Sequence, residues 1–129
     1  LPLKAQEQDS LWVYLNRLNN QGAHKKLIKE YQLASEEGDI IHKGEFLILY
    51  AGAFQNLNLA DSAFLYYSKA LKDFENRNLA EEVAETNLKI SDLLESQNNL
   101  ESDHYSYFEK FWKYATSVND QYLMGKGYN

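Results

Sequence analysis

Hydrophobic and polar residues recur along this chain with the period of an α-helix. The clearest example is the segment 60–74, whose apolar positions are Ala60, Ala63, Phe64, Tyr67, Ala70, Leu71 and Phe74. Residues with this spacing share one face of a helix. Similar stripes occur around Leu11 to Leu18 and around Leu47 to Leu57. No segment shows sustained alternation of period two, so the sequence predicts an all-α fold.

Clusters of Asn, Asp and Gly separate these amphipathic segments, and such residues commonly end helices. The only proline is Pro2, so no later segment is broken by a proline. The pattern predicts helices at 7–20, 22–37, 40–57, 60–76, 79–97 and 100–118, and the start of a further helix at 121–129.

The predicted helices form pairs that repeat about every 40 residues. With a step of 40, Ala51 aligns with Ser91 and Phe54 with Leu94; with a step of 39, Leu15 aligns with Phe54. The sequence therefore predicts a single domain, 1–129, that contains three helical hairpins at about 7–37, 40–76 and 79–118.

The middle hairpin resembles the tetratricopeptide repeat. The residues that carry the resemblance are Leu47, Tyr50-Ala51 and Phe54 on its first helix, and Ala63, Tyr67 and Ala70 on its second. The repeat length is similar to that of the longer-helix variant found in bacterial signalling proteins. The resemblance implies a right-handed superhelix of antiparallel hairpins, an α-solenoid. It also implies a protein- or peptide-binding scaffold without enzymatic activity, in the sensory, regulatory or assembly region of a larger bacterial signalling protein.

In that family the first helix of each hairpin lines the concave, peptide-binding face. The resemblance places there Gln6, Asp9, Val13, Asn16 and Arg17, then Glu45, Ile48, Gly52, Gln55 and Asn56, then Glu85, Leu88, Asp92, Glu95 and Ser96. One arginine among several acids favours basic or polar peptides over acidic ones. A solvated face with no ligand is the alternative. Gly52 is open to two interpretations, close helix packing or the approach of a ligand.

Composition and charge narrow the range of partners. The formal net charge is −6, which argues against nucleic acid or an anionic membrane surface as the main ligand. The longest mostly apolar run, 46–54, is too short to span a membrane. The chain has no cysteine and begins with Leu1. If residues 1–5 are the end of a signal sequence, we expect a periplasmic protein, and otherwise a cytoplasmic one.

Candidate catalytic and metal-binding patterns are sparse. Glu101 and His104 are three residues apart, as are His42 and Glu45, which is a spacing used in di-metal helical bundles. Such sites need several matching pairs, so we interpret these residues as surface polar pairs. No nucleophile, phosphate-loop or zinc motif occurs, and we expect no cofactor. A metal-dependent enzyme on a helical bundle is the least favoured alternative.

The segment 104–115 carries aromatic residues on two faces of one helix. Tyr105, Phe108 and Trp112 share one face, whereas Tyr107, Phe111 and Tyr114 share the other. The last nine residues, 121–129, are too few to cover both faces, so we expect the natural chain to continue past Asn129. We also expect homo-oligomers through an interface formed by Tyr105, Phe108, Phe111, Trp112 and Tyr122. A self-association module with no groove ligand is therefore the main functional alternative.

Overall fold

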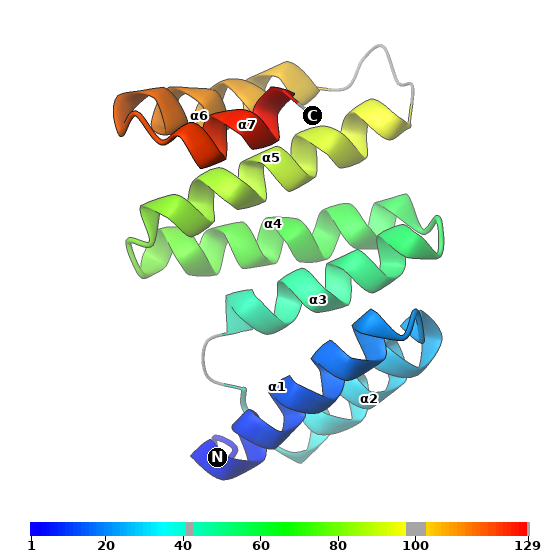
Figure 1. Ribbon diagram of the computed structural model, residues 1–129. Coiled ribbons are helices and arrows are strands. Elements are labelled where there is room, and N and C mark those ends of the chain that lie inside the picture. The colour runs from blue at the N-terminus through cyan, green and yellow to red at the C-terminus, as the bar shows by residue number, and fades with distance from the viewer. Residues whose placement is uncertain (41–42, 98–102, 129) are drawn as a thin grey trace. The chain divides into compact units, whose positions relative to one another are not determined.

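The protein is all-helical in the part of the chain that the computed structural model describes, which is residues 1–40, 43–97 and 103–128 (Figure 1). The helices are α1 Ala5–Asn20, α2 His24–Glu37, α3 Lys43–Asn56, α4 Ala60–Asn76, α5 Ala80–Ser96, α6 His104–Ser117 and α7 Gln121–Tyr128. The all-α prediction is confirmed, and each predicted helix corresponds to an observed one.

The chain divides into two compact units, Leu1–Ala70 and Leu71–Asn129. The boundary lies inside α4, so the first unit contains α1 to α3 and most of α4. The second unit contains the last turns of α4, followed by α5, α6 and α7. Each unit has its own set of buried side chains.

Aromatic side chains join the helices of the first unit. The ring of Tyr31 on α2 lies 4.4 Å from that of Tyr50 on α3, which lies 4.6 Å from that of Tyr66 on α4. Trp12 on α1 contacts Phe46 on α3 edge-on at 5.2 Å. Leu15 and Leu27 are fully buried on α1 and α2. The amphipathic stripes therefore face one another, as their spacing predicts.

Alanines occupy the tightest helix contacts. Ala51, Ala63 and Ala70 have no exposed surface, and Tyr67, between two of them on α4, is 4% exposed. A small side chain lets another helix approach closely, and the neighbouring aromatic ring fills the remaining space. The alternation of small and large residues on this face of α4 thus has a packing origin.

Within residues 1–40, 43–97 and 103–128, four helices end in the same type of turn. Gly22, Asn58, Asn78 and Asn119 adopt positive φ angles of 72°, 61°, 58° and 51°. In each turn the next residue donates its N–H to a carbonyl five residues earlier, for example Ala23 to Leu18 and Leu79 to Phe74. This is the Schellman arrangement, which requires a left-handed residue and so favours Gly or Asn. The punctuation predicted from Asn and Gly clusters is confirmed at these positions.

The N-terminal residues pair with the segment that follows α2. Leu3 N–H donates to the Asp39 carbonyl at 2.8 Å, and Asp39 N–H donates to the Leu1 carbonyl at 3.0 Å. A Cβ atom on Gly38 would lie 2.9 Å from the Leu1 oxygen. Glycine is therefore needed at Gly38 for close approach, and its extended φ of 173° places no conformational demand on the residue.

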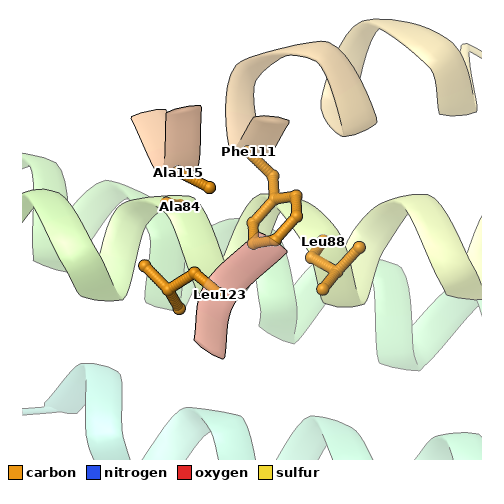
Figure 2. Close-up of a cluster of buried hydrophobic side chains, with 5 residues drawn as sticks. All are labelled: Ala84, Leu88, Phe111, Ala115 and Leu123. Carbon is orange, nitrogen blue, oxygen red and sulfur yellow. The ribbon is translucent and has the colours of Figure 1, made fainter. Parts of the chain in front are cut away.

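The core of the second unit lies where α5, α6 and α7 meet (Figure 2). It comprises Ala84 and Leu88 on α5, Phe111 and Ala115 on α6, and Leu123 on α7. In Figure 2 the ring of Phe111 points from α6 toward the side chains of the other two helices. Asp120 accepts the backbone N–H groups of Tyr122 and Leu123 at 3.0 and 3.1 Å, which fixes the start of α7.

Candidate functional site

In the first unit, the residues predicted for a peptide groove lie outside the core, but several are bonded locally. Asn16 donates to the Trp12 carbonyl and Asn56 to the Gly52 carbonyl, each at 2.8 Å. Gln55 accepts the hydroxyl of Tyr67 at 2.7 Å. The others, Val13, Arg17, Glu45 and Ile48, are exposed or half-buried. The hollow described below for this unit is lined by none of these residues.

Gly52 does not owe its identity to tight packing. A Cβ atom placed there would meet only the Tyr67 hydroxyl at 3.8 Å, which is an ordinary van der Waals distance. The close-packing interpretation of Gly52 is therefore wrong, because α3 has room for a methyl group at this position.

In the second unit, three of the predicted groove residues do come together. Glu85, Leu88 and Asp92 line a hollow of about 290 Å³ together with Lys89 and Lys126, which we call the α5 hollow. Leu88 is 8% exposed and also belongs to the core, so it forms the apolar base of this hollow. Glu95 and Ser96 lie further along α5 and are exposed.

A lysine from α7 reaches the acidic residues of the α5 hollow. Lys126 Nζ lies 3.2 Å from Glu85 Oε1, and both side chains are about one-third exposed, at 33% and 34%. The same ammonium lies 4.7 Å from the centre of the Tyr122 ring. Lys126 is thus held by a carboxylate and by an aromatic face, two features that recognise cations.

Asp92 is an exposed residue whose surroundings make ionisation of its carboxyl less favourable than in water. Partial burial raises the pKa of its carboxyl above the ordinary value; the negative charge of Glu95 raises it further, and Lys89 opposes these effects. Neither Asp92 nor Glu95 forms an ion pair within the described part of the chain. A cation bound beside them would relieve this unfavourable concentration of negative charge.

The predicted interface residues divide into two groups. Tyr105 and Tyr122 are 75% and 72% exposed, and Phe108 and Trp112 are half-buried and stacked on each other at 6.0 Å. Phe111 has no exposed surface, so its assignment to an interface is wrong. The expected lack of cover is therefore wrong for Phe111, against which α7 packs Leu123, whereas Tyr105 on the other face of α6 stays largely exposed.

A glycine in α7 allows this helix to pack closely over Phe111. A Cβ atom on Gly127 would lie 2.9 Å from Phe111 Cε2 and 3.2 Å from Trp112 Cε3. Only a residue without a side chain lets α7 approach the rings so closely. The glycine in this short segment was the sequence signal for the contact, and the aromatic pattern of α6 did not reveal it.

The sequence did not predict a hollow that forms in the first unit, which we call the tyrosine hollow. It has a volume of about 380 Å³, and its walls include Tyr31, Gln32, Leu47, Tyr50 and Tyr66. Gln32 donates to the Tyr50 hydroxyl at 2.8 Å. Burial raises the pKa of both Tyr31 and Tyr50, so these hydroxyls stay protonated at neutral pH. They are poor bases and good hydrogen-bonding groups.

The second unit contains a larger hollow, of about 500 Å³, which we call the Asn87 hollow. It is lined by Leu71, Glu75, Asn78, Ala80, Val83, Ala84, Asn87, Lys110 and Tyr114. Six of these positions lie 40 residues after residues that line the tyrosine hollow: the pairs are Tyr31 and Leu71, Ser35 and Glu75, Gly38 and Asn78, Ile40 and Ala80, Lys43 and Val83, and Leu47 and Asn87. Each hollow therefore occupies the same place in the predicted 40-residue frame.

Metal chemistry receives no support from the described residues. No group of three or more His, Cys, Asp or Glu side chains that could hold a metal ion is found among them. His42 and Glu101, each half of a pair noted in the sequence, lie outside the described residues. In the part of the chain that the structure describes, no helix has both the length and the apolar character that crossing a membrane requires.

Comparison of the chain with models of known protein families, with curated proteins and with solved structures gives no match. The resemblance to tetratricopeptide repeats therefore stays a prediction that depends on the residues named above. The α5 hollow and the two hollows that recur in the 40-residue frame are the candidate binding sites of the described residues.

Proposed function

We propose that this protein is a binding scaffold of tetratricopeptide-like hairpins that holds a basic segment of a partner protein on the acidic face of α5. The observation that carries the proposal is the contact of Lys126 with Glu85 at 3.2 Å, in a hollow that Asp92 also lines. A lysine of the chain itself occupies part of this face. A partner lysine or arginine would find the remaining carboxylates and the apolar base formed by Leu88.

The physical basis of this recognition is charge complementarity at a partly desolvated surface. Cations next to Asp92 and Glu95 favour the ionised carboxylates, which the protein alone disfavours at Asp92. Exposed ion pairs contribute little individually, so the binding should be modest and depend strongly on salt. In this proposal the hairpins form a superhelix and place the first helices on its concave face, and the role in bacterial signalling remains a prediction.

A pair of designed peptides tests the proposal. One is a lysine-rich helical peptide, and the other has the same length with every lysine replaced by glutamate. We expect the lysine peptide to bind in fluorescence anisotropy and its affinity to fall as salt rises. Glu85→Gln and Asp92→Asn should each weaken it about two- to fivefold, as expected for partly exposed ion pairs. Glu109→Gln, at an exposed site on α6, is the control.

A substitution of Lys126 should change the affinity for the lysine peptide in the opposite direction. Because it competes for Glu85, Lys126→Gln should strengthen binding of the lysine peptide. The affinity should also decrease when the pH falls through the raised pKa of Asp92, because protonation removes its charge, and Asp92→Asn should remove that component. Preferential binding of the glutamate peptide, or equal effects of Glu85→Gln and Glu109→Gln, would refute the proposal.

A further inference from the structure

Asn87, one of the residues that line the Asn87 hollow, carries a buried polar atom that lacks a partner. Asn87 and Ala84 are the most buried of the residues that line this hollow, with 3% and 2% of their surface exposed. The Oδ1 atom of Asn87 accepts no hydrogen bond from any residue that the structure describes. Buried amide oxygens in proteins are almost always bonded, and a ligand that brings a donor would satisfy this one.

The equivalent position in the tyrosine hollow shows that packing alone does not require a polar residue there. Leu47 occupies that position 40 residues earlier and is 6% exposed, which makes it an ordinary core leucine. Asparagine at the same place in the second unit leaves an amide oxygen in an apolar setting. Such a substitution costs stability unless something donates to the oxygen.

The Asn87 hollow also has room that the tyrosine hollow lacks. Leu71 stands where the tyrosine hollow has Tyr31, and Ala80 stands where it has Ile40. Both exchanges replace a larger side chain with a smaller one, and the volume is about 500 Å³ compared with about 380 Å³. Volumes of this size, with mainly apolar walls and a few polar groups, are typical of sites for small molecules.

The positive charge of Lys110 beside the Asn87 hollow favours an aromatic ligand. Lys110 lines the hollow, and its Nζ lies 5.4 Å from the centre of the Tyr107 ring. An ammonium group in this position can also face the ring of a ligand. The Tyr114 ring and the side chains of Leu71 and Val83 supply the apolar walls.

We propose that the Asn87 hollow binds a small aromatic molecule that carries a single N–H donor, of the indole type. In this complex the ring lies against Leu71, Val83 and Tyr114, and the Asn87 side chain turns so that its Oδ1 accepts the N–H. This site is separate from the α5 hollow, because Asn87 and Ala84 line one hollow while Glu85 and Asp92 line the other. The inference therefore stands or falls independently of the proposed peptide binding.

Indole and 1-methylindole form a matched pair of probes, because methylation removes the N–H donor and keeps the ring. Each is titrated into the full chain labelled with nitrogen-15, and the amide signals of Val83, Ala84 and Asn87 are followed by NMR. We expect saturable shifts with indole and binding of 1-methylindole that is about tenfold weaker, as the loss of one buried hydrogen bond predicts. Equal binding of the two probes, or no shifts with indole, would overturn the proposal.

Two variants copy residues that the chain itself uses in the tyrosine hollow. Asn87→Leu should raise the midpoint of chemical denaturation, because it removes the unpaired oxygen, and should abolish the preference for indole over 1-methylindole. Ala80→Ile should reduce the affinity for both probes by filling space. Glu109→Gln should leave both affinities unchanged. A lower denaturation midpoint for Asn87→Leu together with an unchanged indole preference would show that Asn87 plays no part in binding.

Discussion

At the scale of single residues, small side chains determine how closely the helices approach. Ala63 has no exposed surface on a face of α4 whose spacing identifies it in the sequence. A residue at such a contact is constrained by volume more than by hydrophobicity, because the protein interior is close-packed. Replacing it by a larger apolar residue should therefore do harm even though the new residue is more hydrophobic.

We predict that Ala63→Leu lowers the free energy of unfolding by about 1–3 kcal/mol, the usual cost of overpacking. Lys72→Leu introduces the same side chain at an exposed position of the same helix and should change the free energy by less than about 0.5 kcal/mol. Urea denaturation of both variants measures the difference. Equal small effects would mean that the contact at Ala63 can expand without strain.

The grouping of functional side chains could be predicted from the sequence only where the residues lie on one helix. The acids of α5 were identified from the repeat frame, and three predicted groove residues do line one hollow. The pairing of Glu85 with Lys126 was not predicted, because it joins residues 41 positions apart and depends on where α7 packs. The tyrosine hollow was missed for a similar reason, since Tyr31, Tyr50 and Tyr66 come from three different helices.

At the scale of the element, the helices were predictable because their ends are encoded in adjacent residues. Each Schellman turn needs one left-handed residue and two short-range hydrogen bonds, and Asn or Gly marks it in the sequence. By contrast, the short length of α7 does not reveal in the sequence that this helix is stable. Its stability comes from Leu123 in the core, from the Asp120 cap and from the close approach at Gly127.

Two glycines with different backbone angles test how backbone conformation contributes to the stability of the helices and their ends. Gly22 has a φ of 72°, whereas Gly125 lies inside α7 without a positive φ, and a Cβ atom at either position would meet nothing within 4 Å. Gly22→Ala should therefore lower the free energy of unfolding by about 1 kcal/mol through backbone strain alone. Gly125→Ala should raise it by up to about 1 kcal/mol, because alanine favours the helix.

Thermal and urea denaturation of the two variants measure these changes. Hydrogen exchange of the α7 amides adds an independent readout for Gly125→Ala, which should slow exchange in that helix. If both alanine variants changed stability in the same direction, backbone conformation would not be the property that distinguishes these sites.

At the scale of the whole molecule, net charge and exposed aromatic surface have opposite effects on self-association. A formal charge of −6 keeps copies of the chain apart at low salt. Tyr105 and Tyr122 expose most of their rings, and large exposed aromatic side chains are a common feature of interfaces. Because Phe111 is buried beneath α7, the surface left for self-association is smaller than the sequence suggested.

We therefore predict weak, salt-promoted association of the chain through Tyr105 and Tyr122. Light scattering over a concentration series should show the mean mass rising with protein concentration, and more steeply at high salt, which screens the repulsion. Tyr105→Ser and Tyr122→Ser should each weaken association several-fold, because both rings are exposed and neither substitution opens the core. Leu65→Ser, at an apolar site on α4 that is 47% exposed, is the control and should behave like the unmodified chain. A mean mass independent of concentration and salt, or an equal effect of Leu65→Ser, would show that α7 completes the cover of α6 and that these tyrosines are ordinary surface residues.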